Sequence, residues 1–194
     1  MRTTRAMLLT GLAVLAAGLT ATTGRLKAED NAALLAKGKW IWFDEGDPSQ
    51  DAPAESRYFR RTFKLPADKD IKKATFLMTG DNHFELYLNG KKIGNGDDWQ
   101  QAQCFDVKAN LVKGDNLIAV IGTNDDGPAG LIGALKVELD GADPVYVGTD
   151  KDFKASKTKA DGWEKAGFDE KGWIPVKVMG DYGMDPWGTQ VNLP

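Results

Sequence analysis

One histidine and one cysteine set the first limit on the chemistry open to this 194-residue chain. A zinc finger, a two-histidine metal site and an intramolecular disulfide each need at least two such residues, so the composition excludes all three. His83 lies in the segment Gly80–His83, and the chain contains no G-x-S-x-G motif that would supply a nucleophile for it to activate. We therefore interpret His83 as a surface or loop-capping residue and the chain as a non-enzyme. Cys104, in Gln103–Val107, is expected to be buried in a strand and inert.

Three expected loops combine carboxylates, amides and an aromatic ring, which is the mixture that sugar binding requires. A flat ring covers the apolar side of a sugar, and amides and carboxylates exchange hydrogen bonds with its hydroxyl groups. The alternative is that these are solvated turn residues, with the aromatic ring partly buried at the edge of the domain. From the three loops we predict five ligand-binding residues, namely Asp81, Asn82, Trp99, Asn124 and Asp126.

Calcium is the metal ion whose oxygen ligands these loops could supply. Neither Asp44–Asp47 nor Asn124–Asp126 begins an EF-hand: counted from Asn124, the twelfth position is Leu135, where that motif needs a glutamate. The sequence therefore assigns no cofactor with certainty, and calcium is the ion to test.

The charge of the chain argues against a nucleic-acid partner. The formal net charge is −3, and loss of residues 1–28, which hold four basic and no acidic side chains, would lower it to about −7. The predicted partner is a carbohydrate or glycan, on the evidence of the three loops, and not a nucleic acid.

Residues 1–28 have the order of a secretory signal peptide. Arg2 and Arg5 form a basic head, the uncharged run 6–21 follows, and small residues occur at Ala21 and Ala28, after either of which cleavage could fall. The apolar run has sixteen residues, fewer than the roughly 20 of a membrane-spanning helix. An uncleaved N-terminal anchor is the alternative, and we expect a secreted or periplasmic protein.

The rest of the chain reads as one all-β domain over residues 39–194, preceded by a short helix or extension over 29–38. Asp30 or Asn31 would cap that helix and Gly38 would end it. No helix long enough for a parallel crossover follows, so the strands should form an antiparallel β-sandwich or jelly roll. The expected strands are Lys39–Phe43, Arg57–Leu65, Ala74–Thr79, His83–Leu88, Leu117–Ile121, Leu131–Leu139, Val145–Val147 and Val176–Met179.

Two turns are explicit in the sequence. Asn89-Gly90 is the strongest short hairpin signal, because both central residues of that turn need positive φ. Gly114 and Asn116 also fit a turn that needs left-handed backbone.

The tryptophans outside the ligand loops are expected to be structural. Trp40 and Trp42 are two residues apart and should share one side of a strand, either in the core or as an exposed sugar platform. Trp163, Trp173 and Trp187 lie among glycines and prolines, where large rings can hold loop-rich chain in place.

Five segments follow one another in a characteristic order, namely Glu85–Gly94 (ELYLNGKKIG), Asn110–Val120 (NLVKGDNLIAV), Thr149–Ser156 (TDKDFKAS), Gly162-Trp163 and Phe168–Trp173 (FDEKGW). They resemble segments of the galactose-binding-like jelly rolls found as non-catalytic N-terminal domains of bacterial α-L-rhamnosidases. These domains carry similar segments in the same order, and the likeness extends from Trp40 to about Trp187. Phe153 stands where a tryptophan is usual, and Glu170–Gly172 departs from the usual spacer.

The resemblance implies an accessory domain and not the enzyme, because no catalytic barrel segment follows it within these 194 residues. The expected function is a secreted, non-catalytic carbohydrate-binding module that serves a separate glycoside hydrolase or a cell-surface protein. A structural or protein-interaction β-sandwich without a sugar pocket is the alternative from another class.

Overall fold

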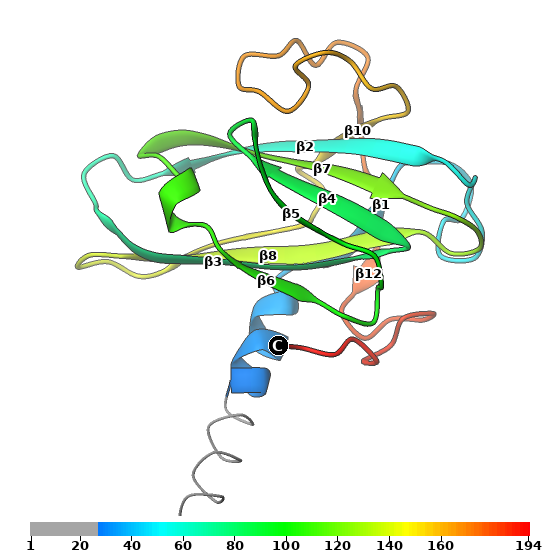
Figure 1. Cartoon of the computed structure of the whole chain (residues 1–194), viewed down its shortest axis with the longest axis horizontal. Coiled ribbons are helices and arrows are strands. Elements are labelled where there is room, and N and C mark those ends of the chain that lie inside the picture. The colour runs from blue at the N-terminus through cyan, green and yellow to red at the C-terminus, as the bar shows by residue number, and fades with distance from the viewer. Residues whose placement is uncertain (1–26) are drawn as a thin grey trace, which may run out of the picture.

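The computed structural model describes residues 27–194, and these residues form a two-layered antiparallel β-sandwich (Figure 1). The two sheets are open, and within each sheet the named strands pair in antiparallel fashion. The predicted all-β sandwich is thus confirmed. The predicted signal peptide lies outside the described residues except for Lys27 and Ala28, which are helical.

The first sheet has the strand order β12-β1-β8-β3-β6, with β9 pairing β8 beyond the end of β1. Its long central pair is β3 and β8, which pair from Ile71 opposite Leu139 to Asp81 opposite Gly130, with one register shift between Ile71 and Lys73. The strands are β1 (Lys39–Trp42), β3 (Ile71–Asp81), β6 (Gln103–Asp106), β8 (Gly130–Leu139), β9 (Val145–Gly148) and β12 (Lys177–Asp181).

The second sheet has the order β11-β10-β2-β7-β4-β5 and packs over the first through its apolar face. A short 3₁₀ helix, η1 (Lys108–Asn110), leads from β6 into β7. The strands are β2 (Ser56–Leu65), β4 (His83–Leu88), β5 (Lys91–Gly96), β7 (Gly114–Thr123), β10 (Lys154–Ser156) and β11 (Ile174–Pro175).

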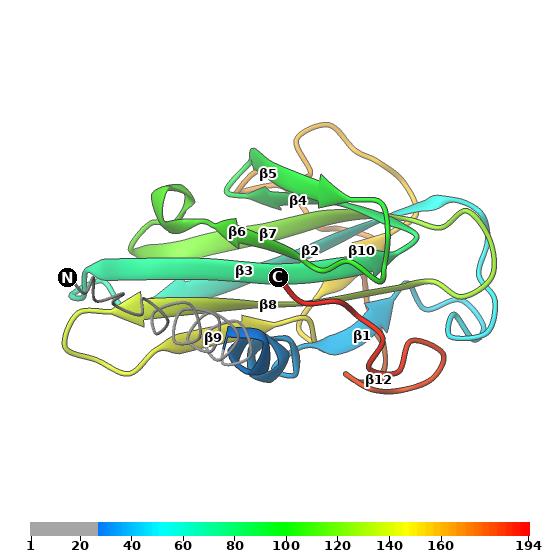
Figure 2. The same cartoon turned by 60° about the horizontal axis from the view of Figure 1, so that its bottom comes forward.

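A helix over residues 27–35 lies on the outer face of the first sheet (Figure 2). It is already helical at residue 27, so the predicted cap at Asp30 or Asn31 is wrong. Gly38 serves a close approach to the sheet: a Cβ there would lie 2.4 Å from the carbonyl oxygen of Gly133. The helix docks so closely that only a residue without a side chain fits between it and β8.

Trp40 and Trp42 are both fully buried, but they do not share one side of β1. The register of β1 against β12 shifts between Trp40 and Ile41, as in a β-bulge. Trp42 therefore joins Ile41 in the core between the sheets, while Trp40 joins a second core on the outer face. The predicted common side is wrong: β1 does not keep strict alternation through this irregularity, where Met179 of β12 is the residue left without a partner on β1.

The Asn89-Gly90 hairpin is confirmed, with φ of 50° and 84° at its two central residues. The Asn89 side chain also donates to the Asn116 side chain (2.9 Å) and accepts a bond from the Leu117 backbone N–H (2.8 Å). Gly114 has positive φ, but among the described residues Asn89 is the one non-glycine that does. Left-handed backbone at Asn116 was thus a wrong prediction; this residue is buried and its amide bonds the turn itself.

The last third of the chain covers both outer faces. Segment 157–173 lies over the second sheet (Figure 1), where buried Trp163 meets Tyr58 and Tyr87 edge-on and stacks with Trp173 at 6.2 Å. Trp187 is buried against the first sheet and stacks on Trp40 at 4.0 Å. These contacts confirm the predicted packing role of the late tryptophans.

Cys104 lies in β6 as predicted, but its side chain is exposed and not buried. β6 is the edge strand of the first sheet, and its residues Cys104 and Asp106 line a cavity instead of packing in the core. Among the described residues, no helix has the length and apolar character needed to cross a membrane.

Candidate functional site

Strand register brings the predicted binding residues of two loops to one end of the sandwich. β3 ends at Asp81, β4 begins at His83, and His83 pairs with Thr123 at the end of β7. The backbone N–H of Asn82 donates to the carbonyl of Thr123 (3.0 Å), and the Asn82 side-chain oxygen accepts from the backbone N–H of Asp125 (2.7 Å). The 81–83 corner and the β7–β8 loop are thus tied together; we call this the loop edge.

Asp81 is the most buried carboxylate of the loop edge, with 7% of its surface exposed. Its Oδ2 accepts a 2.7 Å hydrogen bond from the indole N–H of Trp187. Burial raises the pKa of Asp81 above its usual value, the Trp187 bond opposes this, and the negative charge of Asp126 adds to it. The carboxylate is therefore held in one orientation, with Asp126 near enough for the two charges to interact.

His83 and Asp125 form an exposed pair at the rim of the loop edge, with 2.6 Å between Nε2 and Oδ2. The predicted loop-capping role of His83 is confirmed by this contact, which joins the start of β4 to the β7–β8 loop. Asp125 itself escaped prediction, although it stands between two residues that were chosen.

Trp99 is half-buried and packs against the outer core cluster that contains Trp187. Its carbonyl accepts a 2.8 Å bond from the hydroxyl of Thr79, two residues before Asp81 on β3. The ring is therefore partly committed to packing, and only its exposed part is available to a ligand.

Asn124 is almost fully buried, and its side-chain amide forms a hydrogen bond to the segment before β2. The Nδ2 group donates to the carbonyl of Ala52 (2.9 Å), while the Ala52 N–H donates to the carbonyl of Gly127 (2.9 Å). The segment before β2 is thereby fixed to the β7–β8 loop. The Oδ1 of Asn124 is buried with no hydrogen-bond partner in the described part of the chain.

Arg57 anchors the same segment from the other side. Its guanidinium is 1% exposed and makes a two-pronged ion pair with Glu45 (2.7 and 2.8 Å), plus a bond to Glu55 (2.8 Å). Burial of Glu45 opposes its ionisation, but the hydrogen bonds from Arg57 and Lys157 hold the pKa of Glu45 below its usual value. The segment before β2 is therefore held in place by ion pairs as well as by backbone hydrogen bonds. No sequence motif predicted these ion pairs of Arg57.

The donor set of the loop edge suits calcium better than a softer metal. Residues 27–194 contain no group of three or more His, Cys, Asp or Glu side chains placed to hold a metal ion. Calcium also takes amide and backbone carbonyl oxygens, and the carboxylates of Asp81 and Asp126 and the orphaned Asn124 Oδ1 are of that kind. A bound Ca²⁺ would offset the charge of Asp81 and Asp126.

No family model matches the chain. An α-L-rhamnosidase from Streptomyces avermitilis is 35% identical over 163 residues, and one from Alteromonas sp. is 24% identical over 188 residues. These matches cover 79% and 80% of this chain but only 15% and 20% of the enzymes. The chain thus spans no more than a fifth of the curated relatives it matches.

Solved structures with more than 30% identity carry the same arrangement. The Streptomyces avermitilis α-L-rhamnosidase complexed with L-rhamnose matches with a TM-score of 0.76 over 81% of this chain and 16% of that one. A lectin from Pleurotus ostreatus in complex with GalNAc matches with a TM-score of 0.74 and 32% identity, over 82% and 47% of the two chains.

The fold and its relatives define the class: the chain carries a galactose-binding-like β-sandwich domain. Within that class, it is similar to one part of the bacterial α-L-rhamnosidases and to a fungal lectin. The resemblance predicted from the sequence segments is confirmed.

Proposed function

We propose that this protein is a secreted, non-catalytic carbohydrate-binding domain that holds a saccharide at the loop edge. The observation that carries the proposal is the fixed carboxylate of Asp81, oriented by Trp187 beside Asn82 and Asp126. A sugar hydroxyl donates to such a carboxylate without the carboxylate first having to reorient. The relatives support the ligand class, since one was solved with L-rhamnose and another with GalNAc.

The side chains of the loop edge support binding better than catalysis. The His83–Asp125 pair is exposed at the rim, and its short contact joins two loops. Among residues 27–194, neither side chain forms a hydrogen bond to a serine or cysteine side chain. Asp81 is bound by an indole N–H, which holds the carboxylate in place and leaves little freedom for proton transfer.

Titration calorimetry with L-rhamnose and with GalNAc, each with Ca²⁺ and with a chelator, tests the proposal. We expect binding of at least one sugar, and a loss of about tenfold or more in Asp81→Asn, because a charge-assisted hydrogen bond is lost. Asp68→Asn is the matched control, since this exposed aspartate lies in the β2–β3 turn at the opposite end of β3. A dependence on Ca²⁺ would assign the ion to the same edge.

Absence of binding to both sugars and to a wider glycan panel would contradict the proposal and favour a structural or protein-interaction domain. Equal weakening by Asp81→Asn and Asp68→Asn would move the site away from the loop edge. Hydrolysis of a glycoside that His83→Ala abolishes would contradict the non-catalytic assignment.

A further inference from the structure

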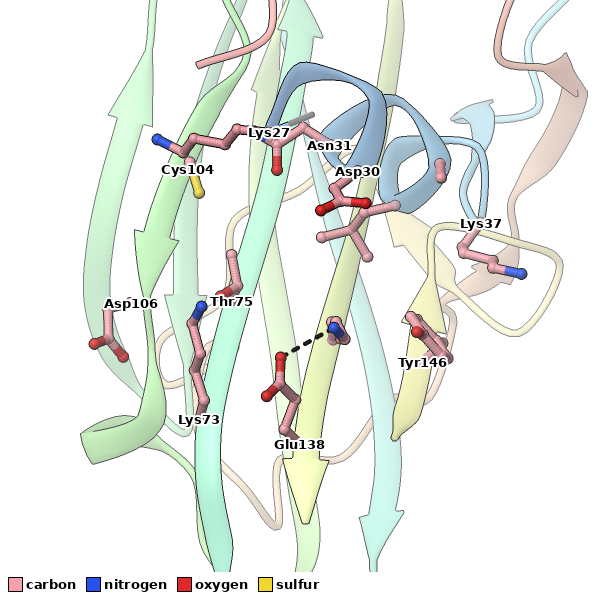
Figure 3. A pocket seen from close by; sticks show the side chains of 13 residues that line it. Lys27, Asp30, Asn31, Lys37, Lys73, Thr75, Cys104, Asp106, Glu138 and Tyr146 are labelled. Atoms are coloured by element: carbon pink, nitrogen blue, oxygen red, sulfur yellow. Dashed lines mark ion pairs between the residues drawn. The ribbon is translucent and has the colours of Figure 1, made fainter. Parts of the chain in front are cut away.

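A second site is suggested by a cavity of about 470 Å³ on the outer face of the first sheet (Figure 3). The helix over residues 27–35 roofs it, and β3, β6, β8 and β9 form its floor and sides. Its volume falls within the range of about 300–1,000 Å³ that is typical of small-ligand sites. None of the five predicted ligand residues lines it.

Lys27, Lys37, Lys73 and Lys136 line the cavity, and among residues 27–194 Lys136 is the one of these four that pairs with a carboxylate. Lys136 is paired with Glu138 at 2.9 Å, and the Lys37 ammonium lies 5.4 Å above the ring of Tyr146. Lys73 stands opposite Glu138 in the register of β3 and β8, yet it has no carboxylate within ion-pair distance among residues 27–194. A carboxylate on a ligand would give Lys73 the partner that residues 27–194 do not supply.

The other polar side chains of the cavity favour a ligand that carries hydroxyl groups as well as a negative charge. The carboxylates of Asp30 and Asp106 and the hydroxyl of Thr75 face the same cavity. Three lining carboxylates, counting Glu138, would repel a dense polyanion, whereas sugar hydroxyl groups can donate to them. A ligand that combines isolated negative charge with many hydroxyl groups satisfies both kinds of side chain.

Tyr146 adds an aromatic surface at the far side of the cavity. Its side chain is 45% exposed on β9, two strands away from Lys73, which corresponds to about 10 Å between the strands. One sugar ring is too short to reach both residues, but two linked rings are long enough. Lys37, above the Tyr146 ring, could meet a second carboxylate there.

We propose that this cavity binds an acidic disaccharide unit, with a uronate carboxylate on Lys73 and the neighbouring sugar ring against Tyr146. This site is separate from the loop edge and prefers a different, charged class of saccharide. It requires no catalysis and no metal ion.

Calorimetry with digalacturonate at low salt tests the proposal, with the dimethyl ester of the same disaccharide as the uncharged probe. We expect digalacturonate to bind and the ester to bind at least tenfold more weakly, because the ester keeps the hydroxyls and loses the charge. Lys73→Gln should weaken binding about tenfold. Lys72→Gln is the matched control, since Lys72 pairs with Asp140 and lies outside the cavity lining, and it should change affinity by less than twofold.

Cys104 provides a second readout, because this single cysteine is exposed and lines the cavity. Bound digalacturonate should slow its alkylation by iodoacetamide, which mass spectrometry measures. The reaction is run at mildly alkaline pH, since partial desolvation by neighbouring groups raises the pKa of the exposed Cys104 thiol. Protection should disappear in Lys73→Gln and persist in Asp81→Asn, which separates this cavity from the loop edge.

No binding of digalacturonate, equal binding of the ester, or equal effects of Lys73→Gln and Lys72→Gln would each overturn the proposal. Protection of Cys104 that Asp81→Asn abolishes would also overturn it, since the ligand would then depend on the loop edge.

Discussion

The loop edge and the cavity beneath the helix use polar side chains in opposite ways. At the loop edge, Asp81, Asn82 and Asn124 already hold hydrogen bonds to the protein, and these bonds fix the loops. In the cavity, Lys73 has no such partner within the described residues. The difference suggests that the loop edge gains affinity from preorganisation, whereas the cavity would gain it from charge and would be sensitive to salt.

The largest effect should come from Trp187, which links the outer core to Asp81. Trp187→Ala removes a buried ring stacked on Trp40 and leaves the Asp81 carboxylate without its donor, so we expect a loss of about 3–5 kcal/mol of unfolding free energy in urea. Trp187→Phe keeps an aromatic ring and should cost less, while still weakening sugar binding at the loop edge. Binding unaffected in Trp187→Phe would show that preorganisation of Asp81 contributes nothing.

The next largest loss of stability should come from Arg57, because its ion pairs hold the segment before β2 in place. Arg57→Ala leaves Glu45, 11% exposed, without its two-pronged partner, and breaking such a pair from one side costs about 3 kcal/mol. Urea unfolding measures the loss. Lys64→Ala is a suitable control, since Lys64 is exposed on the same strand. A matching loss in both variants would mean that the charge network is not what anchors this segment.

Trp99→Ala should affect binding at the loop edge by about 1–3 kcal/mol if the exposed part of the ring stacks on a sugar. Because the ring also packs against the outer core, urea unfolding must be measured beside calorimetry. Digalacturonate binding in the cavity should be unchanged. Loss of stability with unchanged sugar affinity would make Trp99 a packing residue only.

The smallest effect concerns the pH dependence of stability. Burial raises the pKa of Asp81, so the folded protein keeps this proton at pH values where the unfolded chain has lost it. Protonated Asp81 therefore contributes fully to the free energy of unfolding below pH 3.8, the usual pKa of aspartate. This contribution is lost as the pH rises through the higher pKa of Asp81 in the folded protein.

Asp81→Asn should remove that loss while keeping an oxygen for Trp187. Relative to wild type, its unfolding free energy should improve as the pH rises above the usual value of 3.8, in urea titrations at each pH. Asp68→Asn should show no such trend. A parallel pH profile for wild type and Asp81→Asn would contradict the raised pKa.

Local patterns in the sequence predicted much of the fold. Alternation in His83–Leu88 is visible in the buried faces of Phe84, Leu86 and Leu88, and Asn89-Gly90 makes its turn because few other pairs tolerate positive φ twice. The end of the helix was placed correctly to within a few residues. Its start was not, because a cap residue that lies inside a helix looks the same in sequence as one that begins it.

The errors occurred where a residue's environment is set by distant chain. The bulge that separates Trp40 from Trp42 depends on the register with β12, more than 130 positions later in the sequence. Cys104 is exposed because β6 is the last strand of its sheet, and strand order cannot be read from one strand. The cavity was missed because its lysines come from separate elements and form no linear motif.

By itself, the sequence determined the antiparallel β class, the turns and the loops that carry amides and carboxylates, because these depend on residues within a few positions of one another. Only the tertiary structure decided that Trp187 orients Asp81 and that Lys73 faces a cavity without a carboxylate partner in the described chain. Those relations join residues about 100 positions apart or on different strands. Strand pairing and core packing create them, and both are properties of the whole folded chain.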